Sequence, residues 1–335
     1  MRLIRHLADV PPEGRGAVLA LGNFDGVHLG HQAVIRQAAE IAAAHAVPHS
    51  KTPLGVLTFE PHPRSFFRPQ DPAFRLTPFR IKTRHLQALG VDYLFELVFD
   101  AEMAARSAEN FVEEILVAGL GVAHVVVGYD FCFGKGRAGN ASLLTQFGGR
   151  LGFGVTSVAA AKAGDGPAYS STLVREQLKD GNPAAAAATL GRPWEIEGRV
   201  EHGDARGRQL GFPTANVALG EFMEPKLGVY AVMAADDSRD SPEWIHGVAN
   251  LGRRPTVGGT RVQLEVHLFD FAGDLYGKHL RVALIDFIRP EKKFDGLEAL
   301  KAQIASDSAE ARQRLKTYRG PPPGQQARHQ QTHSG

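Results

Sequence analysis

The residue pattern of the chain changes after Arg192, and this change constrains the fold more than any other feature. Before that point, short apolar runs alternate with stretches whose apolar residues recur at helical spacing. The pattern predicts strands over residues 17–21, 55–59, 93–99, 123–131 and 154–160, and helices over 31–47, 83–89 and 107–117. Strands that alternate with helices are typical of a parallel sheet with crossover helices.

The second half is rich in strands instead. Its apolar segments are EIEGRVEH, GVYAVMAAD, WIHGVANLG, VQLEVHLFDF and HLRVALIDFI, and the turns between them hold Gly and Asp. Short strands at such spacing favour an antiparallel barrel or sandwich. We expect one amphipathic helix over 297–315 to close it, with Leu297, Leu300 and Ile304 facing inward.

These patterns predict the domain organisation. We expect a first domain over residues 1–181, a small connector helix over 182–191, capped by Asn182, and a second domain over 192–318. Pro183 suits the first turn of that connector helix. The tail from 319 to 335, RGPPPGQQARHQQTHSG, is rich in Pro, Gly and Gln, and such a composition predicts disorder.

Composition excludes several classes of protein. The chain has 335 residues, of which 43% are hydrophobic and 22% charged, as in a globular protein of about two domains. Its formal net charge is +2 with both signs interspersed, so nothing indicates a nucleic-acid or membrane partner. Cys132 is the only cysteine, which favours a reducing compartment. With no signal peptide or membrane span in the pattern, we expect a cytoplasmic protein that is a monomer or a transient homo-oligomer.

The segment GNFDGVHLGH, residues 22–31, directly follows the first predicted strand. Ligands of parallel sheets bind beyond the carboxyl ends of the strands, and the EPHPR and GYDFCFGKGRAGN segments follow other strands in the same way. His28 and His31 lie three apart at a helix start, where free N–H groups favour anions. Gly22, Gly26 and Gly30 allow a phosphate chain to approach the backbone closely.

Two imidazole donors beside a phosphate can stabilise the charge that develops on a pentacoordinate phosphorus. A second anion signal is SSTLVR, in which the hydroxyls of Ser171 and Thr172 precede Arg175 by about one turn. Two other interpretations stay open for the motifs alone: a helix start with incidental histidines, and simple helix capping. A metal site is less complete, because Asp25 is the only carboxylate near the histidine pair.

Taken in order, GNFDGVHLGHQ, FEPHPR, GYDFCFG and YSSTLVR resemble the nucleotidyltransferase module of bacterial bifunctional riboflavin kinase/FAD synthetases, over about residues 18–178. The resemblance implies a Rossmann-like α/β domain that adenylylates FMN with MgATP. It implies His28, His31 and Arg175 as catalytic residues, and Pro61, His62 and Asp130 beside the flavin. The residues implied to hold ATP are Gly22, Asn23, Phe24, Asp25, His28, Gly30, His31, Ser171, Thr172 and Arg175.

The second half contains the longest motif, HGDARGRQLGFPTANV. Gly203, Gly207 and Gly211 recur every four residues and can form a flexible arch over the phosphates of a nucleotide, although the P-loop pattern is absent. The side-chain oxygens of Thr214 and Asn216 are donors that Mg²⁺ prefers. An ordinary loop in which Asn216 caps a turn is the alternative.

The run VQLEVHLFDF alternates, with Leu264 and Val266 on one side and Glu265 on the other. A carboxylate held on a strand can accept the proton of a hydroxyl group, although an exposed strand position explains Glu265 equally well when the run is taken alone.

Residues 192–311 resemble the riboflavin kinase domain, through GRQLGFPTAN, GVYAV, ANLGRRPTV, LEVHLFDFAGDLYGK and FIRPEKKF. The resemblance implies a six-stranded antiparallel β-barrel with a C-terminal helix. Glu265 would be the base for the ribityl hydroxyl, Thr214 and Asn216 the metal ligands, and Arg289, Glu291 and Phe294 flavin contacts. The residues implied to hold ATP are Gly203, Gly207, Arg208, Gly211, Phe212, Pro213, Thr214 and Asn216.

The leading hypothesis is therefore a bifunctional enzyme that converts riboflavin to FMN and FMN to FAD. Two alternatives are a chain in which only the kinase is active and a flavin-binding regulator without turnover. A cytidylyl- or pantetheine-type transferase would explain the histidine pair but leave the second half unexplained.

Overall fold

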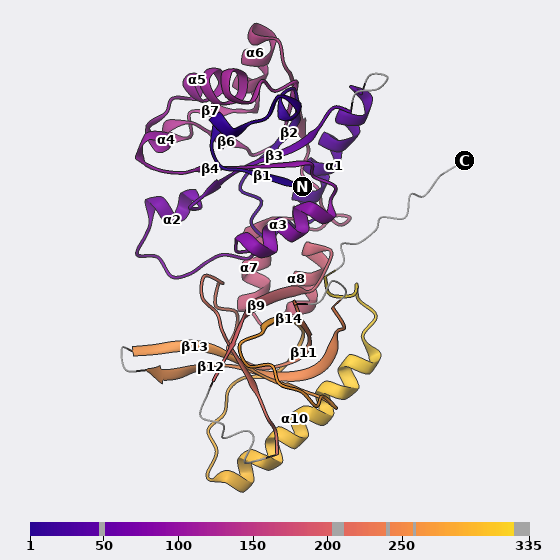
Figure 1. The fold of residues 1–335 in the computed structure, drawn as a ribbon. Coiled ribbons are helices and arrows are strands. Elements are labelled where there is room, and N and C mark those ends of the chain that lie inside the picture. The colour runs from indigo at the N-terminus through magenta and orange to yellow at the C-terminus, as the bar shows by residue number, and fades with distance from the viewer. Residues whose placement is uncertain (47–50, 203–210, 239–241, 257–258, 325–335) are drawn as a thin grey trace, which may run out of the picture. The chain divides into compact units, whose positions relative to one another are not determined.

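The computed structural model describes residues 1–46, 51–202, 211–238, 242–256 and 259–324, and of Pro255, Thr256 and Gly259 only the backbone. The chain forms two compact units, which we describe separately: Met1–Pro72 with Phe79–Ser170, and Ala73–Pro78 with Ser171–Gly335 (Figure 1). Helices α7 (Ser171–Lys179) and α8 (Pro183–Leu190) therefore belong to the second unit. The sequence pattern instead predicts the first of them in the N-terminal domain and the second as a connector between the domains.

The first unit contains a six-stranded parallel sheet with the strand order β1-β4-β3-β2-β5-β8. This confirms the predicted sheet and adds a short edge strand that the apolar pattern did not reveal. The strands are β1 (Arg2–Ile4), β2 (Val18–Leu21), β3 (Leu54–Glu60), β4 (Tyr93–Val98), β5 (His124–Gly128) and β8 (Gly154–Val158). A separate pair, β6 (Cys132–Phe133) and β7 (Gly139–Asn140), is antiparallel.

Helices cover both faces of this sheet, as a buried parallel sheet requires. Val18 and Ala20 of β2 point into a core shared with α1 (Leu29–Ala44) and α3 (Phe79–Ala88). Leu19 and Leu21 point to the opposite core, which η3 (Phe111–Leu120) covers. The remaining elements are η1 (Leu7–Asp9), η2 (Pro12–Gly14), α2 (Pro63–Phe67), α4 (Ala101–Ala105), α5 (Ala108–Asn110), η4 (Lys135–Arg137) and α6 (Ala141–Leu151).

The second unit contains a closed antiparallel barrel with the strand order β10-β13-β12-β11-β14-β9, which confirms the six strands expected from the resemblance. The strands are β9 (Trp194–Glu201), β10 (Ala215–Ala218), β11 (Gly228–Asp236), β12 (Ile245–Thr256), β13 (Gly259–Leu268) and β14 (His279–Arg289). The alternation predicted for β13 is also confirmed: Leu264 and Val266 are buried, and Glu265 and His267 are half-buried.

Helix α10 (Leu297–Thr317) packs against the outside of the barrel through Ala311 and Leu315. The prediction that Leu297 faces inward is wrong, because this side chain is 67% exposed. Only the C-terminal half of the helix reaches the apolar layer on the outside of the barrel, so its first turn lies in solvent. Leu300 and Ile304 are half-buried and line a cavity described below.

The first residues of the predicted disordered tail are packed. The Tyr318 hydroxyl donates to the Pro321 carbonyl at 2.9 Å, Pro323 is buried, and the Gly324 N–H donates to Glu195 Oε1 at 2.8 Å. A buried carboxylate requires donors, and the backbone of the tail provides one of them. The expectation of disorder therefore does not hold for residues 319–324, and residues 325–335 lie outside the described part of the chain.

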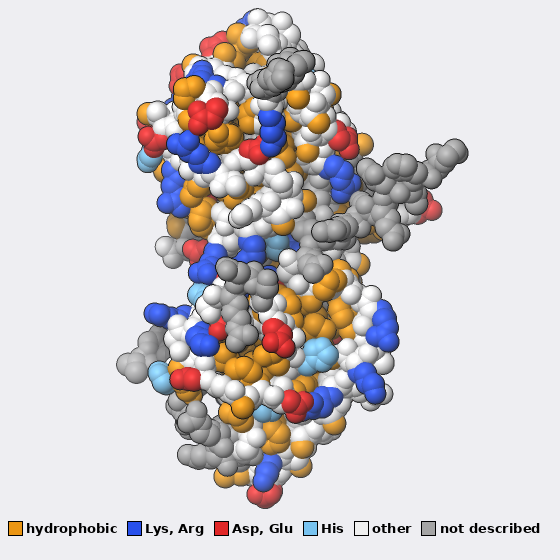
Figure 2. Space-filling model, turned by 45° about the vertical axis from the view of Figure 1, so that its right-hand side comes forward, with side chains coloured by type: hydrophobic (Ala, Val, Ile, Leu, Met, Phe, Trp, Pro, Cys, Tyr) orange, Lys and Arg blue, Asp and Glu red, His pale blue; other side chains and the backbone are white. Residues whose placement is uncertain are grey.

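The surface agrees with the near-neutral composition. On the face drawn in Figure 2, basic and acidic side chains are interspersed, in keeping with a formal net charge of +2. Among the described residues, no helix is both long enough and apolar enough to traverse a bilayer.

Candidate active sites

The loop between β2 and α1, in the first unit, has a strained backbone. Phe24 and Val27 have φ values of 49° and 43°, in the left-handed region that non-glycine residues rarely adopt, and Gly26 has φ 90°. The Gln32 side chain holds the loop by donating to the Val27 carbonyl at 2.9 Å, and the Thr58 hydroxyl donates to the Asn23 carbonyl at 3.2 Å. Such strain persists where surrounding contacts impose it and is typical of ligand-binding loops.

The two predicted histidines lie face to face at the start of α1. His28 caps the helix, and its Nδ1 accepts the backbone N–H of His31 at 3.3 Å. The ring centroids are 3.6 Å apart and the planes differ by 24°, while Phe24 packs edge-on against His31. Because Nδ1 of His28 is an acceptor, a neutral His28 carries its proton on Nε2 and offers that atom as a donor.

Gly30 is required by close packing at this corner. A Cβ atom at this position would lie 3.1 Å from the His28 ring and 3.2 Å from the Tyr169 carbonyl oxygen. The side chain that fits here without displacing either neighbour is a hydrogen atom. The motif glycine therefore brings the segment before α7 against the histidine pair.

A cavity of about 630 Å³ opens beside this loop. Gly22, Asn23 and His62 line it, whereas Pro61 and Asp130, also predicted to contact flavin, are not among the lining residues. Phenylalanines form most of its apolar wall, and several cationic side chains stand around it. Sequence reasoning missed both sets: Phe59, Phe67, Phe99, Phe111, Phe131 and Phe133, and Arg64, Arg68, Arg106, Lys135 and Arg137.

These phenylalanines are dispersed over five segments of the chain, so no local motif marks them. The rings of Phe59 and Phe67 each meet that of Phe99 edge to face, with centroids 5.6 and 5.7 Å apart. Phe67 is nonetheless 63% exposed, which is unusual for so large an apolar side chain. An exposed aromatic wall next to cations suits a flat aromatic ligand that carries a negative charge.

The predicted residues of the SSTLVR segment lie in the second unit. Helix α7 begins at Ser171, so Ser171 and Thr172 occupy its first turn and neither is the residue that precedes the helix. The Arg175 Nε donates to the Phe74 carbonyl at 2.9 Å, and the guanidinium lies 5.4 Å from the centroid of the Phe74 ring. Their contact with ATP at the histidine loop stays a prediction.

The barrel unit has two adjoining cavities that share Thr214. The first, of about 410 Å³, lies between β9, β10, β13 and the loop after β13, with Pro213, Thr214 and Tyr276 among its lining residues. The second, of about 370 Å³, lies between the barrel and α10. It brings together six residues that the sequence analysis selected: Phe212, Thr214, Glu265, Arg289, Glu291 and Phe294.

Glu265 projects into the second cavity from the middle of β13. Its strand neighbours are Asn216 of β10 and Asn250 of β12. Arg254 donates from Nε to Glu265 Oε1 at 2.8 Å, and its Nη2 lies 2.7 Å from the same oxygen. Asn216 is 8% exposed and lies between Glu265 and Glu201 on the neighbouring strands.

His267 follows Glu265 by two residues on the same face of β13, and its imidazole has a structural contact. Its Nδ1 lies 2.9 Å from the Pro213 carbonyl oxygen, and its ring meets the Phe212 ring edge to face. The imidazole therefore fixes the segment that leads into Thr214. Gly211 begins this segment with φ 87°, while Gly203, Gly207 and Arg208 of the predicted arch lie outside the described residues.

Arg289 ties the wall of the second cavity to α10. It donates to the buried Asp307 carboxylate at 2.9 and 3.1 Å from Nε and at 2.7 Å from Nη2. Its guanidinium also lies 5.7 Å from the centroid of the Phe294 ring. This arrangement places Arg289 at the predicted flavin site and shows that it also holds the helix in place.

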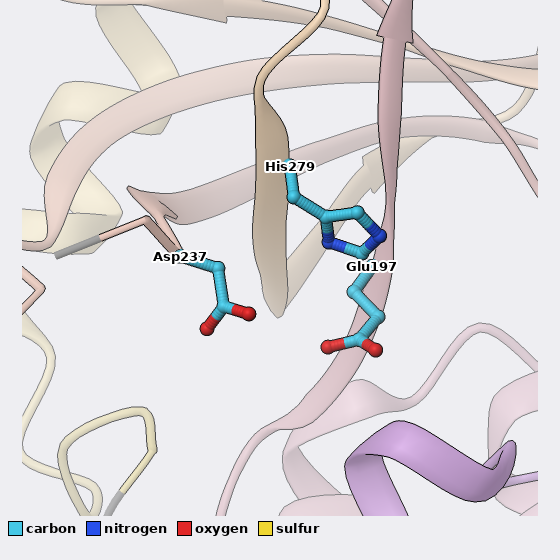
Figure 3. A group of neighbouring side chains, drawn as sticks. All are labelled: Glu197, Asp237 and His279. Atoms are coloured by element: carbon cyan, nitrogen blue, oxygen red, sulfur yellow. The ribbon is translucent and has the colours of Figure 1, made fainter. Parts of the chain in front are cut away.

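A further group of polar side chains lies apart from these cavities. Glu197 of β9, Asp237 after β11 and His279 of β14 place their potential ligand atoms within 4.8 Å of one another (Figure 3). Arg281 faces this group, 3.8 Å from Asp237, while its two short bonds go to Glu195. A guanidinium thus already supplies positive charge here, and we assign no metal to this group.

The comparisons with known proteins match both units of the chain. The family model for FAD synthetase matches residues 10–173, and the family model for riboflavin kinase matches residues 190–315. A parallel-sheet unit that matches FAD synthetase, joined to a barrel that matches riboflavin kinase, defines a two-domain enzyme of flavin nucleotide synthesis.

Relatives that span nearly the whole chain specify the family. The bifunctional riboflavin kinase/FMN adenylyltransferase of Escherichia coli K12 is 46% identical over 93% of this chain and 97% of its own length. Its namesake in Bacillus subtilis is 37% identical over 90% of this chain and 93% of its own. The chain belongs to the family of bifunctional riboflavin kinase/FMN adenylyltransferases.

A solved structure shares the whole two-unit fold. A crystal structure described as that of a macrolide-efflux protein from Streptococcus pneumoniae matches with a TM-score of 0.80 at 30% identity. The match covers 92% of this chain and 98% of that one.

Proposed function

We propose that this chain phosphorylates riboflavin with ATP in the barrel unit and adenylylates FMN with ATP in the parallel-sheet unit. One observation carries the proposal: Glu265, the predicted base, lines the second barrel cavity, which shares Thr214 with the first barrel cavity of about 410 Å³. A hydroxyl substrate and a phosphate donor can thus meet at Thr214. The family membership and the histidine loop of the first unit support the other half of the proposal.

In the kinase reaction, the ribityl chain of riboflavin enters the cavity that Glu265 lines. Glu265 accepts the proton of the terminal hydroxyl, whose oxygen forms a bond to the γ-phosphorus of ATP. The bond from that phosphorus to the bridging oxygen breaks, and ADP leaves. A carboxylate on a barrel strand is held rigidly, which is what a general base requires.

Thr214 and Asn216 offer a hydroxyl and an amide oxygen, a donor set that fits Mg²⁺. Asn216 is almost fully buried, and two carboxylates, those of Glu265 and Glu201, stand on its neighbouring strands. Bound Mg²⁺ would neutralise phosphate charge during the transfer. The two side chains themselves would orient the phosphates, since both lie on or beside β10 next to the base.

In the adenylyltransferase reaction, the phosphate of FMN is already ionised and needs no general base. One of its oxygens forms a bond to the α-phosphorus of ATP, and pyrophosphate leaves. His28 and His31 donate hydrogen bonds to the phosphate oxygens, and the strained loop presents its backbone beside them. The phenylalanine wall of the neighbouring cavity suits the isoalloxazine ring, and its cations suit the FMN phosphate.

Several parts of this proposal rest on the family resemblance. They are the roles of Arg175, Ser171 and Thr172 with ATP, those of Pro61 and Asp130 with flavin, and the glycine arch over residues 203–211. The same holds for the cytoplasmic location, for the state as a monomer or transient homo-oligomer, and for the absence of a nucleic-acid partner.

Two half-reactions assayed separately test the proposal. Riboflavin with MgATP should give FMN, and FMN with MgATP should give FAD, as separated by chromatography. Glu265→Gln should abolish the first reaction and spare the second, whereas His31→Ala should do the reverse. Glu224→Gln is a matched control, because this exposed carboxylate contacts Arg253 and lines neither barrel cavity.

The alternatives predict other outcomes. A kinase-only chain would form no FAD from added FMN. A regulator would bind FMN and consume no ATP in either assay. Glu265→Gln with an undiminished kinase rate would reject the base assignment.

A further inference from the structure

Arg254 of β12 forms an ion pair with Glu265. Its Nε donates to Oε1 of Glu265, and its Nη2 lies 2.7 Å from the same oxygen. The Arg254 side chain is 49% exposed and that of Glu265 is 24% exposed. An ion pair with this much exposure to water adds little to stability. Both residues line the second cavity, so the contact belongs to the site rather than to the core.

The pairing leaves the second carboxylate oxygen available. Within the described part of the chain, Glu265 Oε2 accepts no hydrogen bond, whereas Oε1 accepts one from Arg254 Nε and lies 2.7 Å from Arg254 Nη2. A glutamate side chain has three rotatable bonds, and one oxygen held by a planar guanidinium fixes how the other is presented. A base must keep its orientation to within about 10–20° to act on a positioned hydroxyl.

We propose that Arg254 is a positioning residue of the kinase: it holds Oε1 of Glu265 so that Oε2 receives the proton of the substrate hydroxyl. This inference rests on the proposed role of Glu265 as the base. Arg254 acts through Glu265 and forms no bond with riboflavin or ATP. Its loss therefore slows the proton transfer and leaves the binding of both substrates intact.

The chain contains a matched control in the adjacent residue. Arg253 is also half-exposed and also pairs with a carboxylate, Glu224, at 2.6 Å. It does not line the second cavity, and successive residues of a strand point to opposite faces. Replacement of either arginine removes one charge and one ion pair from the same strand, but only Arg254 contacts the base.

The experiment compares Arg254→Gln, Arg254→Lys, Arg253→Gln and Glu265→Gln in the full chain. It measures the kinase kcat, the KM for riboflavin and for ATP, and riboflavin binding by flavin fluorescence. We expect Arg254→Gln to lower kcat by about 10- to 100-fold, with both KM values within about twofold of the wild type. Arg254→Lys restores part of the rate because its ammonium can bind Oε1 once, and Arg253→Gln behaves as the wild type.

The double variant Arg254→Gln/Glu265→Gln separates positioning from an independent role. If Arg254 acts only through Glu265, the double variant is no slower than Glu265→Gln alone. A further loss in the double variant, or a KM for ATP raised by Arg254→Gln, would show a direct contact with the phosphates and overturn the inference. So would a kcat for Arg254→Gln equal to that of the wild type.

Failure of the underlying function gives a different result. If Glu265→Gln retained the wild-type kcat, the base assignment itself would fall. If Glu265→Gln lost activity while Arg254→Gln kept it, only the role of Arg254 would fall. The unfolding midpoint of each variant, followed by tryptophan fluorescence, shows whether the barrel unit is intact.

Discussion

Asp307→Asn should destabilise the barrel unit strongly, because it removes one charge from a buried pair and keeps the size of the side chain. The Asp307 side chain is 5% exposed and that of Arg289 is 20% exposed. Asp307 accepts three bonds from Arg289 and one, at 3.0 Å, from Gln303. The new amide keeps one acceptor oxygen, but its NH2 group replaces the other, and a guanidinium that has only donors cannot accept from it.

The magnitude follows from this geometry. Breaking a buried ion pair by removing one partner costs about 3–5 kcal/mol. Arg289 keeps some contact with water and a bond to the Pro290 carbonyl at 2.9 Å, so we expect a loss of about 3 kcal/mol, at the lower end. With an m-value of about 2 kcal/mol/M, the urea midpoint should fall by about 1.5 M.

Tryptophan fluorescence during urea unfolding measures this shift in the correct unit, because Trp194 and Trp244 both belong to the second unit. Asp270→Asn is the matched control. Asp270 also binds an arginine of α10, Arg312, through bonds of 2.7 and 3.0 Å, but its side chain is 80% exposed. We expect no resolvable change in the midpoint for this variant.

Equal shifts in the two variants would refute the reasoning, because burial would then not determine the strength of the pair. A small shift for Asp307→Asn would do the same. A kinetic measurement complements the unfolding measurement. Because Arg289, Leu300 and Ile304 all line the second cavity, the KM of the kinase for riboflavin should rise in Asp307→Asn. The same KM should stay unchanged in Asp270→Asn.

Three further predictions concern single positions. Gly30→Ala should lower the adenylyltransferase rate at least about tenfold and spare the kinase, because the new Cβ would displace the His28 ring. Gly149→Ala in α6 is the control: a Cβ there meets nothing within 4 Å, so this variant should stabilise the chain slightly. Asn216→Ala should chiefly raise the Mg²⁺ concentration that the kinase needs, as a titration of rate against Mg²⁺ would show. Desolvation alone would raise the pKa of Asp236, but hydrogen bonds from Ser238 and Lys278 outweigh it and lower the pKa from 3.8 to about 2. A carboxyl group with a lowered pKa stabilises the fold above its unfolded pKa, so Asp236→Asn should be destabilised at pH 7, and the difference from the wild type should shrink as the pH falls from about 4 to about 2.

Much of the fold follows from local pattern alone. The apolar run 17–21 is buried on both faces of a parallel sheet, and the alternation around Glu265 becomes a barrel strand with one buried side. Both patterns record the exposure of successive residues of one element, which is why a short window of sequence suffices. The second-cavity residues Thr214, Glu265 and Arg289 were likewise found from motifs.

Tertiary structure decided what depends on residues far apart in the chain. The pattern of α10 predicts that Leu297 faces inward, but this side chain is exposed. The buried residues of the helix include Asp307 instead, because Arg289 of β14 pairs with it. The phenylalanine and cation walls of the first-unit cavity come from segments separated by many residues. The assignment of α7 to the barrel unit has the same origin, since Arg175 binds the Phe74 carbonyl across 101 positions.

The sequence by itself therefore determined the parallel sheet and an antiparallel β second half, because hydrophobic period is a local property, and the motif resemblance added the six-stranded barrel. Only the tertiary structure showed that Thr214 borders both barrel cavities and that Arg254 holds one oxygen of Glu265. A cavity and the orientation of a side chain arise from contacts between distant strands, and no local spacing encodes them.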